Sequence, residues 1–474
     1  MYMARTISGD SSKYREAIVS GPIITVFLRL GLPLLFVRLV QDIYGIVDAF
    51  WLSRYNQFAM AVPRQVWPAY SLFSSFVMSF ASANLAILSQ YVGAKMYDNI
   101  NDVASKMLSV SIASGSISGA LFYLSSRYIF KNFVASPNEI LDHVLLYSYI
   151  MSIDMVFLSL NLTISVLIQS IGDTKTSAFS QMVGAITNVV LDPVLIMGYS
   201  CIPPMGTAGA ALATVLSKVV SIVILMERLF KRYSWVKLRI MFSVDKDYLK
   251  LALRIATPLL VMNISNTIAF NLQNRLINTF GVIATTAVSV GFIVFDLANT
   301  SLWGLTESIA IMVGQNLGAN NRERARKIAI TTSSFIFLSV FLTSIIMYFV
   351  RNSIIAIFIT GENVPKDTIE MIYNEVEKFL TITIWTLAFF ALTFSAMSVG
   401  RGSGHTLIPT VVNMIRLWGI RIGMGYILGV VVGLATLGIY IAFALSNIVG
   451  GLLSFLWMYK GSWSKPIVKK EFRI

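Results

Sequence analysis

The sequence predicts an all-α membrane protein with twelve transmembrane helices in two pseudo-symmetric lobes of six helices each. Three observations support this fold class: a high mean hydropathy, a series of long apolar segments, and an internal repeat of about half the chain. The mean hydropathy is +0.73, with 56% apolar and only 13% charged residues. These values lie well outside the range of soluble domains.

Twelve apolar segments are each long enough to cross a hydrocarbon core of about 30 Å, which takes ~20 residues in an α-helix. The segments are continuous and do not alternate with a period of two residues, which excludes the strands of a membrane β-barrel. They lie near residues 22–52, 60–92, 104–130, 140–171, 177–200, 206–229, 249–279, 284–315, 328–350, 372–400, 406–430 and 432–459.

The second half of the chain repeats the first. Matching residues recur at offsets of 225 to 230 residues: Pro33/Pro258, Gln90/Gln315, Gly93/Gly318, Gly172/Gly402, Gly209/Gly438 and Ser217/Ser446. In a hydrophobic chain, a repeat of this length is typical of a transporter whose two bundles surround a central site. We expect an N-terminal lobe at residues 1–229, a linker at 230–248 and a C-terminal lobe at 249–474, related by an axis along the membrane normal because each half has six spans.

The net charge of +14 comes from basic residues in alternate loops. This pattern orients a membrane protein and argues against nucleic-acid binding. It predicts a multi-pass protein of the plasma membrane with both termini in the cytoplasm. The basic residues on the predicted cytoplasmic side are Arg5, Lys13, Arg15, Lys95, Lys106, Lys231, Arg232, Lys237, Arg239, Lys246, Arg322, Arg324, Arg326, Lys327, Lys465, Lys469, Lys470 and Arg473.

The sequence contains no motif for catalysis or for a resident cofactor. It has one cysteine, Cys201, and two histidines that are far apart, His143 and His405. No P-loop, HExxH or GxSxG sequence occurs, so we expect neither ATP binding nor enzyme activity. An intramembrane enzyme would need a set of metal ligands or a nucleophile with a base, and this chain offers neither.

Two acids lie deep in apolar spans of the first half, where an ionised group is costly unless it is paired or hydrated. Asp48 lies in span one, one turn after Tyr44. Asp192 lies in span five, four residues after Asn188 and directly before Pro193. This proline leaves the carbonyl four residues earlier without its usual donor. Such a group of oxygens suits Na⁺ or a proton, and we predict a cation site formed by Asp48, Asn188, Asp192 and Thr214.

The repeat supports a functional role for these acids because the second half lacks both. Gln273 stands in the place of Asp48, and Arg421 in the place of Asp192. The alternative is that both acids form structural ion pairs, for which Arg38 is a candidate partner.

Other charged residues in the spans leave alternatives open. Arg38 and Asp42 are four residues apart on span one and are expected to pair with each other. Asp154 of span four, with Asn161 two turns later, either lines a cavity or lies near the membrane interface. The arginines of the second half either form internal pairs or line the central cavity, where they would favour anionic substrates: Arg275, Arg416 and Arg421.

Seven segments together resemble the multidrug and toxic compound extrusion (MATE) family, nearest its archaeal and DinF-like branch. The resemblance covers residues 15–460. The segments that carry it are GPIITVFLRLGLPLL, YGIVDAFWLS, QYVGA, IGDTKT, NVVLDPVLIMG, GTAGAALATVLS and VGQNLGANNRERAR.

The resemblance implies two six-helix lobes that form a V around a central cavity, in a monomer embedded among membrane lipids. It implies export of small amphiphilic organic solutes, chiefly cationic ones, by antiport against Na⁺ or H⁺. In the matching motifs, cation binding falls on Asp48, Asn188, Asp192 and Thr214. Gln41 and Tyr44 match cavity positions, and we add Asp154, Asn161, Gln273 and Arg421 to the expected cavity. A bend of span one at Pro33 is the hinge that the resemblance implies.

The chain departs from the family pattern at Arg38, Asp42 and Gln169, and near Asp154–Val156, where a proline of span four is replaced. Arg38 and Asp42 stand where relatives have uncharged residues, and Gln169 stands where they have an arginine. These changes alter the charge of the N-terminal cavity, so the range of substrates does not follow from the resemblance. A flippase for a lipid-linked oligosaccharide is the alternative function, because it shares the architecture and its pyrophosphate would need cations such as the arginines of the second half.

Overall fold

The structure is a computed structural model that describes residues 10–56, 58–241, 243–359 and 365–468. Apart from one isolated bridge, Tyr199–Ile202, the regular elements in these ranges are helices. In chain order they are α2 (Asp10–Ser20), α3 (Ile23–Tyr55), α4 (Ala61–Gly93), α5 (Tyr97–Tyr128), η1 (Ile129–Phe133), α6 (Asn138–Ile171), α7 (Thr174–Met197), α8 (Thr207–Arg232), α9 (Lys246–Asn278), α10 (Val282–Gly318), α11 (Arg322–Phe358), α12 (Lys366–Thr383), η2 (Ile384–Thr386), α13 (Leu387–Ser403), α14 (Leu407–Met414), η3 (Ile415–Met424), η4 (Ile427–Val431) and α15 (Ala435–Lys460).

Each predicted span coincides with a long helical segment. Eleven segments among the described residues are long and apolar enough to cross a membrane. The remaining predicted span lies in α10, where Val282–Ile293 is a shorter apolar stretch. The all-α membrane fold class is therefore confirmed, and the chain is a multi-pass membrane protein.

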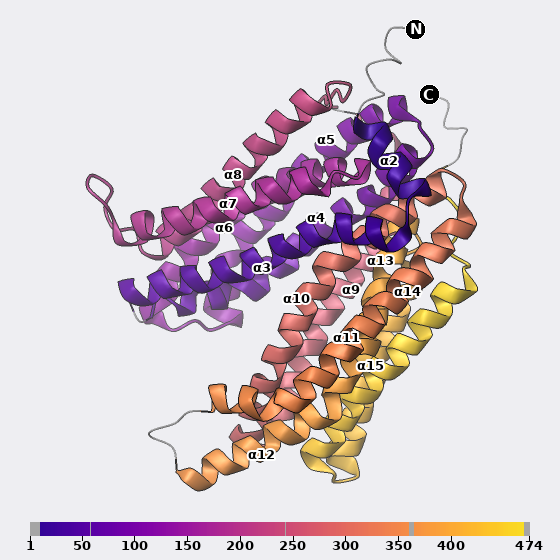
Figure 1. Ribbon diagram of the computed structural model, residues 1–474. Coiled ribbons are helices and arrows are strands. Elements are labelled where there is room, and N and C mark those ends of the chain that lie inside the picture. The colour runs from indigo at the N-terminus through magenta and orange to yellow at the C-terminus, as the bar shows by residue number, and fades with distance from the viewer. Residues whose placement is uncertain (1–9, 57, 242, 360–364, 469–474) are drawn as a thin grey trace.

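Figure 1 shows how the helices are arranged in two lobes. Helices α3 to α8 form one group, and α9 to α15 form the other. The groups meet at the end of the molecule that carries α2 and diverge towards the end that carries α12, which gives the predicted V shape (Figure 1).

The lobes meet at a glycine motif that occurs once in each repeat. Helix α4 ends with Gln90 and Gly93, and α10 ends with Gln315 and Gly318. A Cβ atom on Gly93 would overlap the backbone of Gln315, and one on Gly318 would overlap the backbone of Gln90. Each glutamine amide also donates to a carbonyl of the opposite lobe: Gln90 to Ser403 at 3.2 Å and Gln315 to Ser170 at 2.7 Å. Glycine is needed at both positions because the backbones approach so closely.

Helix α2, which the sequence analysis did not predict, packs against this junction and contacts both lobes. The Arg15 guanidinium donates two hydrogen bonds, of 2.9 and 2.7 Å, to the carbonyl of Gly93. From the other lobe, the Asn316 amide donates to the carbonyl of Ile18 at 3.3 Å. Four of the residues expected on the cytoplasmic side, Arg5, Lys469, Lys470 and Arg473, lie outside the described residues.

The connection between the lobes is shorter than the predicted linker and follows one side of α5. The helices end and begin at Arg232 and Lys246. Three polar side chains of α5 form hydrogen bonds with the backbone of this connection. They are spaced four residues apart and therefore lie on one face of the helix. Asn101 accepts from the Lys237 amide at 2.8 Å, Ser105 accepts from the Arg239 amide at 3.1 Å, and Ser109 accepts from the Met241 amide at 2.7 Å. This polar row was not predicted.

Two spans differ from the uninterrupted α-helices that the apolar pattern predicts. The segment near 372–400 is divided into α12 and α13 by the 3₁₀ turn η2. The segment near 406–430 is α-helical only in α14 and then continues as the π-helical segments η3 and η4. In contrast, α3 is a single helix that continues through Pro33.

Candidate functional site

The predicted cation site is formed by three helices of the N-terminal lobe. Helix α3 contributes Asp48, α7 contributes Asn188 and Asp192, and α8 contributes Thr214. The Asn188 amide donates to Oδ1 of Asp192 at 3.4 Å, across one helical turn. The Thr214 hydroxyl donates to the carbonyl of Ala210 at 3.1 Å, so its oxygen lone pairs are available to a cation.

Three oxygens of this group are buried without a hydrogen-bond partner: Oδ1 of Asp48, Oδ2 of Asp192 and Oδ1 of Asn188. Buried polar atoms are normally paired, because an unsatisfied one costs about 1–3 kcal/mol. Asp48 and Asp192 also lie close enough to repel each other. The arrangement of two acids and an amide with unsatisfied oxygens fits a small cation or a proton, which would relieve both penalties.

A second buried polar group lies beside the first. The carboxylate of Asp154 on α6 is completely buried, accepts a 2.6 Å hydrogen bond from the Tyr70 hydroxyl, and forms an ion pair with Lys218 of α8. Tyr44 of α3 lies within electrostatic range of Asp154 in this group and of Asp48 in the first. Asp154 is therefore an interior residue of the N-terminal lobe, and its role in the cavity stays a prediction.

Lys218 is the residue of this region that the sequence analysis missed. Its ammonium group also lies 5.9 Å from the centre of the Tyr70 ring. The available signal was a single lysine inside the apolar sequence VLSKVVSIV of span six. A lone cation within a span needs a counter-ion, but the sequence does not say that this counter-ion comes from span four.

Lys218→Met is expected to lower the stability of the protein by about 3–5 kcal/mol, the range found when one partner of a buried ion pair is removed. The methionine fills a similar volume but leaves the Asp154 carboxylate buried without a cation. The double variant Asp154→Asn/Lys218→Met should recover much of the loss, because no charge then remains and Tyr70 still has an acceptor. Thermal unfolding in detergent measures both effects. An unchanged Tm for Lys218→Met would contradict the assignment of a stabilising pair.

The other predicted positions lie in different surroundings. The Arg38 guanidinium donates to Gln41 at 3.3 Å, and within the described residues it forms no ion pair with Asp42, so the expected Arg38–Asp42 pair is wrong. Gln41 in turn donates to Gln181 of α7 at 3.4 Å. Asp42 is instead exposed and lies within electrostatic range of Asp296 on α10.

Two of the expected cavity residues make contacts inside their own lobes. The Asn161 amide donates to the Ser221 hydroxyl at 2.9 Å, which joins α6 to α8. Arg421 of η3 donates to Asn447 of α15 at 2.7 Å. Gln273 of α9 is buried, with 4% of its surface exposed. The cavity role of all three stays a prediction.

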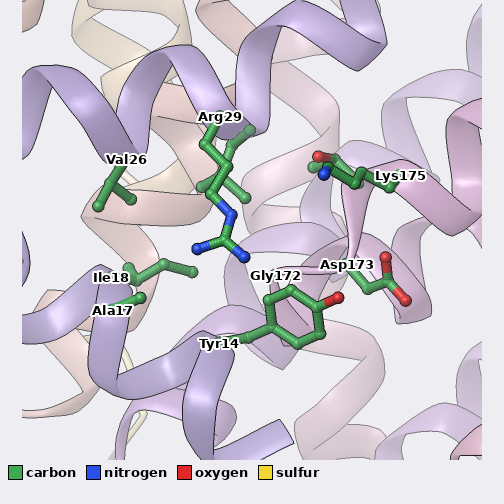
Figure 2. A pocket seen from close by; sticks show the side chains of 10 residues that line it. Tyr14, Ala17, Ile18, Val26, Arg29, Gly172, Asp173 and Lys175 are labelled. Carbon is green, nitrogen blue, oxygen red and sulfur yellow. The ribbon is translucent and has the colours of Figure 1, made fainter. Parts of the chain in front are cut away.

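A pocket lies away from Asp48 and Asp192, at the closed end of the V. Figure 2 shows that it is bounded by α2, α3 and the turn before α7, with Tyr14, Ile18, Val26, Arg29, Gly172 and Asp173 in its lining. Next to it, burial raises the pKa of Tyr233 above its usual range, so this hydroxyl stays protonated and donates to Asp173 at 2.7 Å. Because no predicted site residue lines this pocket, we attribute it to the packing of α2.

Comparison with known proteins agrees with this fold. The chain is 25% identical over 441 residues to "Probable multidrug resistance protein YoeA" of Bacillus subtilis, covering 90% of this chain and 93% of the relative. It is 24% identical over 456 residues to "Probable multidrug resistance protein NorM" of Thermotoga maritima, covering 94% of each. A crystal structure of a MATE protein in the bent conformation superposes with a TM-score of 0.85 at 19% identity, covering 94% of this chain and 97% of that one.

The family comparison follows the internal repeat. The family model described as MatE matches twice, at residues 33–194 and 258–427. The two matches begin at Pro33 and Pro258, the first repeated pair of the sequence, and together they cover more than half of the chain. The predicted resemblance is thus confirmed: this protein belongs to the MatE family.

Proposed function

We propose that this protein is a secondary active transporter that exports amphiphilic organic solutes, chiefly cationic ones, by antiport against Na⁺ or H⁺. The single observation that carries the proposal is the group of buried oxygens without partners at Asp48, Asn188 and Asp192. Such a group gains free energy when it binds a cation or a proton, which is what a coupling site must do. The relatives named as multidrug resistance proteins support export of organic solutes rather than flipping of a lipid-linked oligosaccharide.

The proposed cycle depends on competition for the charge of the acids in the N-terminal lobe. When the cavity is open to the cytoplasm, the ionised carboxylates of Asp48 and Asp192 attract a cationic solute. The lobes then move so that the cavity opens outward. A cation entering from outside neutralises the carboxylates, the solute loses its electrostatic partner, and it is released. Gradient energy therefore enters as a difference in affinity between two states.

The available driving force is sufficient for this cycle. Exchange of one inward cation for one outward monovalent cationic solute moves no net charge, so the concentration gradient of the coupling cation supplies the free energy. Since ~1.4 kcal/mol corresponds to a tenfold ratio of concentrations, a tenfold gradient of that cation can maintain a tenfold solute gradient.

Transport by purified protein in liposomes tests the proposal. Vesicles are loaded with ethidium, a fluorescent cationic dye, and receive either a Na⁺ gradient or a pH gradient of defined sign. We expect dye movement under one of the two gradients, and the effective gradient identifies the coupling ion. An ionophore that collapses that gradient should stop the movement. If dye moves no faster than in protein-free vesicles under both gradients, the proposal is wrong.

A further inference from the structure

The C-terminal lobe contains two buried cations on one face of a π-helical segment. Arg416 and Arg421 both belong to η3, where backbone hydrogen bonds join residues five apart and bring such residues onto one side. Arg416 is 5% exposed, and Arg421 is half-buried. In an ordinary α-helix two residues five apart would point in clearly different directions. The π-helical geometry therefore creates a paired cationic site.

Both guanidinium groups converge on one neutral side chain. Oδ1 of Asn447 on α15 accepts from Arg416 at 3.2 Å and from Arg421 at 2.7 Å. Arg416 also donates to Asn413 at 2.9 Å, and Arg421 donates to Ser446 at 3.0 Å. All of these acceptors are uncharged.

Neither arginine has a carboxylate partner among the residues that the structure describes. The Arg421 guanidinium lies 3.9 Å from the centre of the Phe443 ring, and the Arg416 guanidinium lies 5.1 Å from that of Phe390. Such cation–π contacts stabilise a buried guanidinium by less than its burial costs. Nε of Arg416 is also buried without a hydrogen-bond partner. Among the described residues, the site thus carries positive charge without a carboxylate counter-ion, and one N–H donor, Nε of Arg416, has no acceptor.

The repeat shows that this site is the counterpart of the acid region in the N-terminal lobe. With an offset of 229 residues, Arg421 takes the place of Asp192, and Asn447 takes the place of Lys218. The first lobe has an acid on α7 and a cation on α8, whereas the second lobe has a cation on η3 and a neutral amide on α15. At the position shared by Asp192 and Arg421, the two lobes therefore carry opposite charge.

We propose that Arg416 and Arg421 form a binding site for the oxyanion group of a transported solute, namely a phosphate or carboxylate. A guanidinium offers two parallel N–H donors that match the oxygens of such groups. The proposal rests on the proposed transport function and extends it to solutes that carry an anionic group on an apolar body. A phosphate of a membrane lipid has the same chemistry, and the test below distinguishes the two sources.

Equilibrium binding of two matched fluorescent probes tests the site without any need for transport. Flavin mononucleotide carries a phosphate that riboflavin lacks, and fluorescence anisotropy measures the binding of both to purified protein in neutral detergent. We expect flavin mononucleotide to bind at least about tenfold more tightly than riboflavin, because hydrogen bonds to charged groups contribute ~1.5–3 kcal/mol. Inorganic phosphate should compete, and chloride at equal ionic strength should not. Equal binding of the two probes, or no binding of either, would overturn the proposal.

Variants localise the binding to this site. Arg421→Gln should reduce flavin mononucleotide binding to the riboflavin level, and Arg421→Lys should retain part of it because the charge remains. Arg322→Gln, which removes an exposed arginine at the start of α11 in the same lobe, is the matched control and should bind as the wild-type protein does. Full binding by Arg421→Gln would contradict the assignment. Competition by phosphatidylglycerol would identify a lipid headgroup as an occupant of the site, and lack of competition would identify a soluble solute.

Discussion

Asp48→Asn is expected to abolish gradient-driven dye transport in liposomes while the protein remains folded. Asparagine has nearly the same shape as aspartate, so the packing of α3 is preserved. The side chain is then neutral whether or not a cation or proton arrives. The cation gradient therefore can no longer change the affinity of the protein for the solute. Asp192→Asn should have the same effect, because each of the two carboxylates has a buried oxygen without a hydrogen-bond partner and the two repel each other.

The control for this prediction is Asp142→Asn, which makes the same change at an exposed acid near the start of α6. Its transport should equal that of the unchanged protein. If Asp48→Asn and Asp192→Asn both retain gradient-driven transport, the acids of the N-terminal lobe are not the coupling site, and Asp296 and Glu307 of α10 become the next candidates.

Gly318→Val should also eliminate transport, but through a different step. A side chain at this position would overlap the backbone of Gln90, so the reciprocal contact between α4 and α10 cannot form. The closed end of the V, which we propose to be the cytoplasmic end, would then stay open. Because Asp48 and Asp192 belong to the N-terminal lobe and take no part in this contact, equilibrium binding of the dye should persist while net transport falls to the level of protein-free vesicles.

The open state can be detected with a cysteine at the lobe junction. Ser89 is completely buried beside Gly314 of the opposite lobe, and the native cysteine, Cys201, is exposed and is first replaced by serine. Ser89→Cys should be shielded from a water-soluble maleimide in the otherwise unchanged protein and react in Gly318→Val. Gly45→Val is the control, since a side chain there meets open space. Equal shielding with and without Gly318→Val would contradict the role of this contact.

The fold could be predicted from the sequence because its main determinants are local. Each span needs only a continuous apolar stretch, and the twelve stretches are visible by inspection. The repeat also marked Gln90, Gly93, Gln315 and Gly318 as important. What the sequence did not show is that these four residues contact one another, since a repeat indicates equivalent positions and not contacts between them.

The candidate site was predictable only in part for the same reason. Asp48 and Asp192 stand out because charge is rare in apolar spans, and Pro193 marks the local break in hydrogen bonding. The partner of Asp154 did not follow, because Lys218 lies 64 residues away and on another helix. The pair formed by Arg416 and Arg421 was equally hidden, because it depends on a π-helical segment that periodicity analysis reads as an ordinary α-helix.

The central claim is that solute and coupling cation compete for Asp48 and Asp192. The most direct measurement is the equilibrium affinity for ethidium as a function of Na⁺ concentration and, separately, of pH. Competition requires the affinity to fall as one of these cations increases, and linkage requires the dye to weaken binding of that cation by the same factor. We expect the ethidium affinity of the wild-type protein to depend on one of these cations, and we expect this dependence to be lost in Asp48→Asn/Asp192→Asn. An affinity that does not change with either cation in the unchanged protein would contradict the account.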